Sequence, residues 1–119
     1  YRYAETLLNA AELIAVHGCT GKGSADAYLN EVRARAGLGN KGANLESILH
    51  ERHVELMGEG KRYWDLIRLG EAASVLTPAN DEGGYRTKAW TENKKYLPFP
   101  QSEMDATAST QYPLTQNNY

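Results

Sequence analysis

Apolar residues that recur at steps of three and four are the feature that most constrains what this chain can fold into. Between Tyr3 and Val16 this spacing lines one face of a helix, as in an amphipathic helix packed against a core. The apolar set of this segment is Tyr3, Leu7, Leu8, Ala11, Ile14 and Ala15. Gly18 ends the pattern, and Ser24 is placed to cap a second helix. The apolar side of the second helix is Tyr28, Leu29 and Val32. The two segments together predict an αα-hairpin.

A second pair of helices is predicted further along the chain. Asn44 is placed to cap a helix that runs to about Met57, and two glycines, Gly58 and Gly60, then weaken helix formation. The buried side of this helix is expected to comprise Leu45, Ile48, Leu49, Val54 and Leu56. Helical spacing resumes from Lys61 to Leu69, where core positions are expected for Tyr63, Trp64, Leu66 and Ile67.

The chain changes character after Pro78. Turn-forming residues occupy positions 81–84, and the aromatic residues that follow have no helical spacing. Two prolines at positions 98 and 100 exclude a continuous helix there, and one short helix is expected at 101–106 before a polar tail. We therefore predict a mainly α fold, with tetratricopeptide-like helical hairpins in an α/α stack over residues 1–77 and an irregular loop and tail over residues 78–119.

Composition and charge exclude several classes of function. The formal net charge is -2, and Lys and Arg are interspersed with Asp and Glu, so no basic stripe exists to bind nucleic acid. No apolar run approaches the roughly 20 residues that a membrane-spanning helix requires. The single cysteine, Cys19, excludes a disulfide within the chain.

The charged run between positions 51 and 68 is predicted to be structural. Glu51 and Glu55 follow the four-residue helical step, and arginines are interleaved with them. We expect Glu51, Glu55, Arg62 and Asp65 to form an ion-pair and hydrogen-bond network between the third and fourth helices. Catalytic carboxylates at a glycosidic bond require separation across a cleft, so no catalytic residue is assigned.

Metal and cofactor sites are not expected. His50 and His53 are three residues apart, whereas the zinc-protease motif needs two histidines four apart. The glycine-containing stretch 37–42 follows no strand and lacks the Gly-Lys-Ser/Thr ending of a phosphate-binding loop. It is interpreted as a connection between helices.

Four segments resemble, in the same order, the C-terminal region of SusD/RagB proteins. The first two are Arg2-Tyr3-Ala4-Glu5 and the stretch from Val32 to Gly37, which reads Val-Arg-Ala-Arg-Ala-Gly. The third is the most specific, and it comprises Glu51-Arg52-His53-Val54-Glu55-Leu56 and Glu59-Gly60-Lys61-Arg62-Tyr63-Trp64-Asp65-Leu66-Ile67-Arg68. The fourth is Leu97-Pro98-Phe99-Pro100-Gln101-Ser102-Glu103 together with Leu114-Thr115-Gln116-Asn117. His53 stands where the family usually has an arginine.

The resemblance implies that residues 1–119 are the C-terminal part of a longer lipoprotein. Such a protein is exported, is held at the outer-membrane surface by a lipid anchor outside this segment, and captures oligosaccharides or other nutrients. Its implied partner is a SusC-like TonB-dependent outer-membrane transporter, and it is not an enzyme. The alternatives from the residues alone are a helical-repeat adaptor that binds peptides in a concave groove, and a hydrolase.

Aromatic residues in the irregular segment are the candidates for sugar contact. Tyr85, Trp90 and Tyr96 lie in a stretch expected to be exposed, and aromatic faces stack on sugar rings. The alternative is that these side chains fold back to cover the helices. Because ligand pockets usually take residues from several segments, the main binding site is expected outside this chain.

Overall fold

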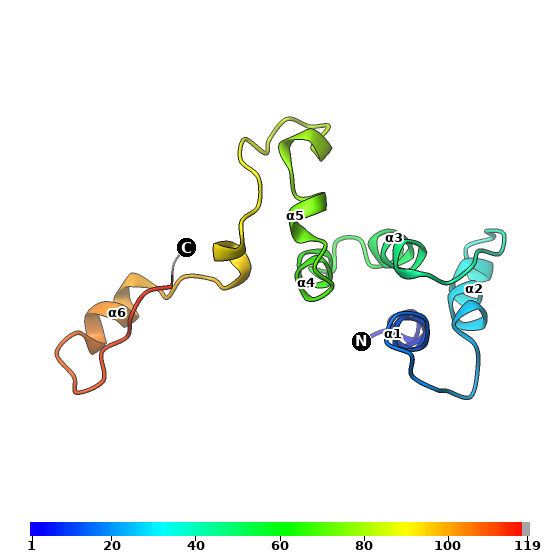
Figure 1. Cartoon of the computed structure of the whole chain (residues 1–119), viewed down its shortest axis with the longest axis horizontal. Coiled ribbons are helices and arrows are strands. Elements are labelled where there is room, and N and C mark those ends of the chain that lie inside the picture. The colour runs from blue at the N-terminus through cyan, green and yellow to red at the C-terminus, as the bar shows by residue number, and fades with distance from the viewer. Residues whose placement is uncertain (118–119) are drawn as a thin grey trace. The chain divides into compact units, whose positions relative to one another are not determined.

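The computed structural model describes residues 1–117, and its regular structure within that range is helical throughout (Figure 1). The α-helices are α1 (Tyr3–Ala15), α2 (Ala25–Arg35), α3 (Leu45–Glu55), α4 (Arg62–Arg68), α5 (Ala72–Val75) and α6 (Gln101–Thr107). Two short 3₁₀ helices, η1 (Pro78–Asn80) and η2 (Glu92–Lys95), lie between α5 and α6. The prediction of a mainly α fold is confirmed.

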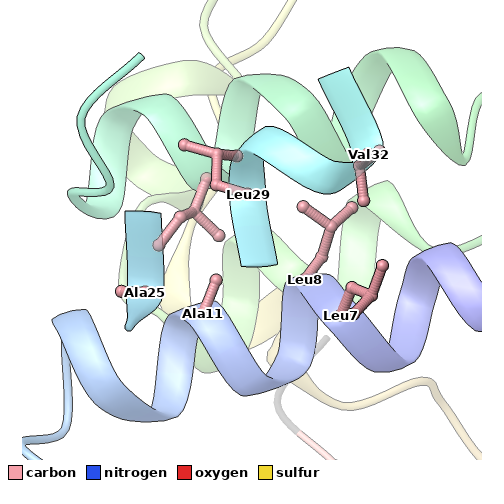
Figure 2. Close-up of a cluster of buried hydrophobic side chains, with 7 residues drawn as sticks. Leu7, Leu8, Ala11, Ala25, Leu29 and Val32 are labelled. Carbon is pink, nitrogen blue, oxygen red and sulfur yellow. The ribbon is translucent and has the colours of Figure 1, made fainter. Parts of the chain in front are cut away.

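The core lies between α1 and α2, and α3 also packs against α1. Leu8, Ala11 and Leu29 are fully buried at the contact between the two helices. Figure 2 shows Ala25 beside Ala11 and Val32 above Leu7 and Leu8, so the helices run antiparallel, as the predicted αα-hairpin requires. Fully burying a leucine side chain stabilises a fold by about 1.5–3 kcal/mol, and this small cluster is the main apolar contribution to the hairpin.

Both predicted helix caps are present. The Ser24 side chain accepts a hydrogen bond from the Ala27 N–H at 3.1 Å. The Asn44 side chain accepts one from the Ser47 N–H at 2.8 Å, while the Ser47 hydroxyl accepts from the Asn44 N–H at 2.9 Å. This reciprocal pair is a capping box, which satisfies two backbone donors that the first helical turn leaves without partners.

Side chains of α2 hold the connection to α3. The Asn30 amide bonds the backbone of Lys41 in both directions, at 2.8 and 3.0 Å. The Arg33 Nε–H donates to the Gly39 carbonyl at 2.8 Å. This stretch is therefore an ordered helix connection, in agreement with the interpretation made from the sequence.

The chain forms two compact units, Tyr1–Asp65 and Leu66–Tyr119. The first contains α1 to α3 and the beginning of α4, and the second contains the remaining elements. The sequence predicted one domain, with helical hairpins over residues 1–77 and a loop and tail over residues 78–119. These compact units do not test that division, which stays a prediction. No helix among the described residues is long and apolar enough to cross a bilayer.

Several residues expected on the buried faces of helices are exposed instead, among them Tyr3 of α1 at 69%. Val54 and Trp64 have 57% and 52% of their surface accessible. The apolar side of α3 consists of Ile48, Leu49 and Leu56, and Val54 points away from it. In α4 the fully buried position is Leu66, whereas Trp64 packs its ring edge-on against Tyr63 at 5.4 Å. For Trp64, helical spacing was a weak guide because α4, with seven residues, is too short to define a single apolar face.

Candidate functional site

A buried arginine–carboxylate pair joins α3 to α4. Arg52 and Asp65 both have only 4% of their surface exposed. The Arg52 guanidinium donates to the two Asp65 carboxylate oxygens at 2.8 and 3.0 Å, and its third contact is a 2.6 Å hydrogen bond to the Asn9 side chain of α1. Planar, two-point contact with a carboxylate is the geometry that arginine, and not lysine, provides. One side chain therefore ties three helices together.

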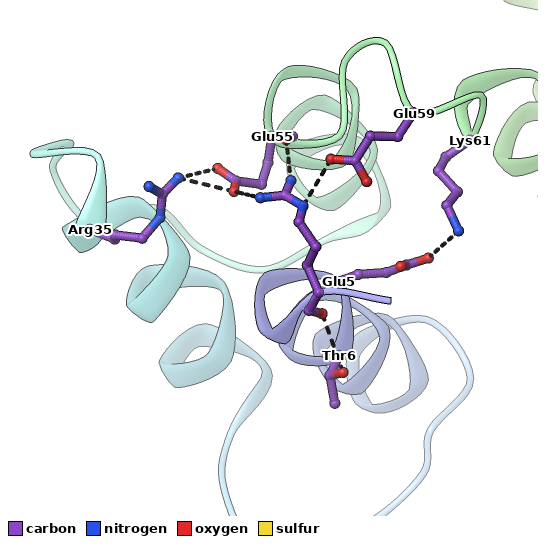
Figure 3. A network of polar contacts seen from close by, with 7 residues as sticks. Glu5, Thr6, Arg35, Glu55, Glu59 and Lys61 are labelled. Carbon is purple, nitrogen blue, oxygen red and sulfur yellow. Dashed lines mark hydrogen bonds and ion pairs between the residues drawn. The ribbon is translucent and has the colours of Figure 1, made fainter.

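The glutamates of α3 bind arginines that lie earlier in the chain. Glu51 is buried and accepts a 2.7 Å bond from Arg33 of α2. Glu55 accepts bonds from Arg35 of α2 at 2.8 and 3.0 Å and from Arg2 at 3.0 Å. Figure 3 shows Arg35 reaching Glu55 from the end of α2. These pairs fix the C-terminal turns of α2 and α3 against each other.

The predicted network between the third and fourth helices is therefore wrong in its partners. Asp65 does bond to α3, but through Arg52, which the prediction did not name. Arg62 also reaches α3, where its Nη1–H donates to the Leu49 carbonyl at 3.1 Å. Glu51 and Glu55, in contrast, pair with arginines outside α4. Helical spacing identified which residues of these helices are charged and share a face. It could not identify their ion-pair partners, because these depend on which helix lies opposite each face.

A buried glutamate on α1 was missed by the sequence analysis. Glu5 is 4% exposed, its Oε1 pairs with Lys61 Nζ at 3.1 Å (Figure 3), and its Oε2 is buried without a hydrogen-bond partner among the described residues. Lys61 also lies 5.1 Å from the centre of the Tyr1 ring, a cation–π contact. The available signal was the spacing, because Glu5 lies three residues before Leu8 and shares its face of the helix.

The closing motif of the chain clamps the proline-rich stretch. The Gln116 side chain accepts from the Phe99 N–H at 2.9 Å and donates to the Phe99 carbonyl at 3.1 Å. The Asn117 amide donates to the Leu97 carbonyl at 2.6 Å. A side-chain amide thus supplies both a donor and an acceptor to an extended backbone that forms no sheet. These bonds hold the tail, which the sequence analysis left without a contact.

The three aromatic candidates for sugar contact differ in exposure. Tyr85 is 91% exposed and Tyr96 is 66% exposed, so both rings present faces to solvent. Trp90 is only 8% exposed, and its backbone N–H donates to the Leu76 carbonyl at 3.0 Å. Trp90 therefore follows the alternative expectation, that the side chain folds back, and its backbone bond anchors the segment between the two tyrosines.

Metal-ligating side chains do not cluster within residues 1–117, where no three His, Cys, Asp or Glu residues come together to hold an ion. The buried carboxylates of Glu5, Glu51 and Asp65 bond to lysine or arginine instead. Such pairs stabilise packing, and each of these three carboxylates is neutralised by a basic side chain.

The chain thus consists of helical hairpins joined by buried ion pairs, which is a mainly α fold of the tetratricopeptide-like type. The model of the SusD family matches residues 1–119, and the chain belongs to that family. Among curated relatives, SusD-like protein P2 of Formosa agariphila is 34% identical over 117 residues, a match that covers 87% of this chain and 22% of that protein.

Two solved structures extend the comparison. Surface glycan-binding protein A from Bacteroides thetaiotaomicron in complex with laminarihexaose is 58% identical, with a TM-score of 0.87, and the match covers 100% of this chain and 24% of that chain. A laminarin binding SusD-like protein is 34% identical, with a TM-score of 0.70, over 98% of this chain and 22% of its own. The chain thus spans about a quarter or less of the proteins that it matches.

Proposed function

We propose that the whole protein containing this chain is a non-catalytic, glycan-binding protein of the outer-membrane surface, and that its ligand is a glucan of the laminarin type. The observation that carries the proposal is the 58% identity, along 100% of this chain, to a surface glycan-binding protein whose structure contains laminarihexaose. A second laminarin-binding relative supports the same ligand class at 34% identity.

The chain contributes a rigid scaffold to this function. Its buried Glu51, Arg52 and Asp65 are engaged in ion pairs between helices, and Tyr85 and Tyr96 are exposed aromatic residues of the irregular segment. We assign the auxiliary sugar contacts of this segment to these two rings, with buried Trp90 as the residue that positions them. The main binding site lies in the part of the whole protein outside this chain.

The family also supports a location and a partner. We assign the whole protein to the cell surface, held in the outer membrane by a lipid anchor outside this segment. Its partner is a SusC-like TonB-dependent transporter, to which it delivers captured oligosaccharide. A binding protein in that position needs no hydrolytic chemistry.

Calorimetric titration of the whole protein tests the proposal. Laminarihexaose should bind, cellohexaose should bind at least about tenfold more weakly, and no new reducing ends should appear during incubation. Equal affinity for the two hexasaccharides would refute the laminarin assignment. Release of shorter oligosaccharides would refute the non-catalytic assignment.

The tyrosine assignment has its own matched control. Tyr85→Ala and Tyr96→Ala in the whole protein should each weaken laminarihexaose binding by a few-fold, as expected for loss of one auxiliary stacking surface. Tyr112→Ala is the control, because Tyr112 is 80% exposed and lies outside the predicted segment. If all three variants bind like the wild type, residues 85–96 make no sugar contact.

A further inference from the structure

A small cavity lies where α3 ends and α4 begins. Its volume is about 280 Å³, and its lining comes from the last turns of α3, the connecting loop and the first turn of α4. The loop contributes Gly58 and Gly60, with φ of 81° and 71°, values that residues with a side chain rarely adopt. Because glycine has no side chain, these two residues leave open space in the cavity that larger residues would fill.

The described lining contains no carboxylate, whereas basic side chains are present. Arg52, His53, Lys61 and Arg62 all line the cavity. A second groove of about 400 Å³, beside α1 and α2, differs in this respect: it is lined by Arg2 and Arg35, but also by Glu31 and by Glu55, which binds both arginines. Of these two hollows, the one at the start of α4 combines cations with a lack of carboxylates.

Arg62 is the cation in this cavity whose charge no ion pair balances. Arg52 is bound to Asp65 and Lys61 to Glu5, whereas Arg62 donates one hydrogen bond, to the uncharged Leu49 carbonyl. Partial burial lowers the pKa of Arg62, and the nearby Asp65 carboxylate opposes that effect. A guanidinium carries five N–H donors in a plane, so most of the donors of Arg62 are available to a ligand.

The remaining lining suits an organic ligand. Leu56, Met57 and Tyr63 supply apolar and aromatic surface next to the cationic side. The volume falls near the lower end of the range for ligand pockets, which suits one sugar ring or a molecule of that size. Because one guanidinium, that of Arg62, lacks an ion pair among the described residues, a ligand with one negative charge would balance it. Its planar N–H donors can bond to both oxygens of a carboxylate.

We propose that this cavity binds a monocarboxylate of about the size of a uronic acid, with Arg62 as the residue that grips the carboxylate. The site is independent of the laminarin-type ligand, which is uncharged. The carboxylate belongs either to a sugar acid, in which case the ring occupies the space beside Tyr63, or to a small free organic acid.

Titrating the whole protein with sodium glucuronate, sodium acetate and glucose tests the site and separates the two sources. Glucuronate should bind and glucose should not. Glucuronate binding at least about tenfold tighter than acetate identifies a sugar acid, and equal binding of the two identifies a free carboxylate. If glucose binds as well as glucuronate, or if neither carboxylate binds, the proposal is wrong.

Variants at the arginine give the second test. Arg62→Gln should weaken glucuronate binding by at least about tenfold, because a charge-assisted, two-point contact is lost. Arg86→Gln is the control, since Arg86 is exposed and lies outside the cavity. Arg62→Lys keeps the charge without the planar donors, and it should bind with intermediate affinity. If either Arg62 variant binds glucuronate with wild-type affinity, Arg62 is not the residue that binds the carboxylate. This holds even if the other variant does not fold.

His53 offers a readout that does not depend on affinity. Its pKa is lowered by burial first, and then by the charges of Arg62 and His50. A bound carboxylate adds a negative charge beside the ring and should raise the His53 pKa, measured by NMR with labelled histidine at saturating glucuronate. No change in the His53 pKa at saturation would place the ligand elsewhere.

Discussion

Replacing Arg52 by alanine should destabilise the chain far more than replacing Arg62. Arg52 makes two bonds to Asp65 and one to Asn9, and its side chain is 4% exposed. Arg62 makes one bond, to a backbone carbonyl. The Arg52→Ala variant leaves a buried carboxylate without its two strongest donors and separates α1, α3 and α4 at one point.

The magnitude follows from these contacts. Removing one partner of a buried ion pair costs about 3–5 kcal/mol, because the other charge stays desolvated. Loss of the single, part-buried Arg62 bond should cost about 1.5 kcal/mol. At roughly 4 °C per kcal/mol for a chain of this size, Arg52→Ala should lower the Tm by about 12–20 °C and Arg62→Ala by about 6 °C.

Urea unfolding followed by far-ultraviolet circular dichroism measures these differences. Arg86→Ala serves as the control, since Arg86 is exposed, and its free energy of unfolding should stay within about 0.5 kcal/mol of the wild type. An Arg52→Ala loss no larger than the control would refute the view that this pair joins the helices. A larger loss for Arg62 than for Arg52 would refute the assignment of the partners.

Three further predictions concern single side chains. Gln116→Ala should speed hydrogen exchange of the Phe99 amide about fivefold to tenfold, because its acceptor is lost; unchanged exchange would contradict the clamp. Asn44→Ala should cost about 1 kcal/mol of unfolding free energy through the lost helix cap, and Asn40→Ala, in the preceding loop, should cost less than half of that. NMR titration should show a folded-state pKa of His53 below 6.5, so that its contribution to stability falls as the pH drops from about 6.5 through that lowered pKa; an unshifted value would contradict the burial.

Local features of the fold could be predicted from the sequence because their causes are local. The cap at Asn44 depends on residues within three positions, and both it and the hairpin of α1 and α2 are confirmed. The partners of Glu51 and Glu55 could not be predicted, because they depend on the rotation of α2 relative to α3. The burial of Trp90 was one of two alternatives, and the sequence could not decide between them because no periodic pattern describes an irregular segment.

The family motifs gain a physical explanation from the structure. Arg52 and Asp65 of the third resembling segment form the buried pair between α3 and α4. Gln116 and Asn117 of the last segment hold the backbone at Phe99 and Leu97. Both sets hold the chain's own structure together.

Comparing laminarihexaose titrations of the whole protein and of the 119-residue chain tests the central claim most directly. The account predicts binding by the whole protein and a Kd of about 1 mM or weaker for the chain alone, because most polar and stacking groups of the site come from other segments. Equally tight binding by the chain, lost in Tyr85→Ala or Trp90→Ala, would show that the main site lies within these residues. Lack of binding by the whole protein would contradict the proposed function itself.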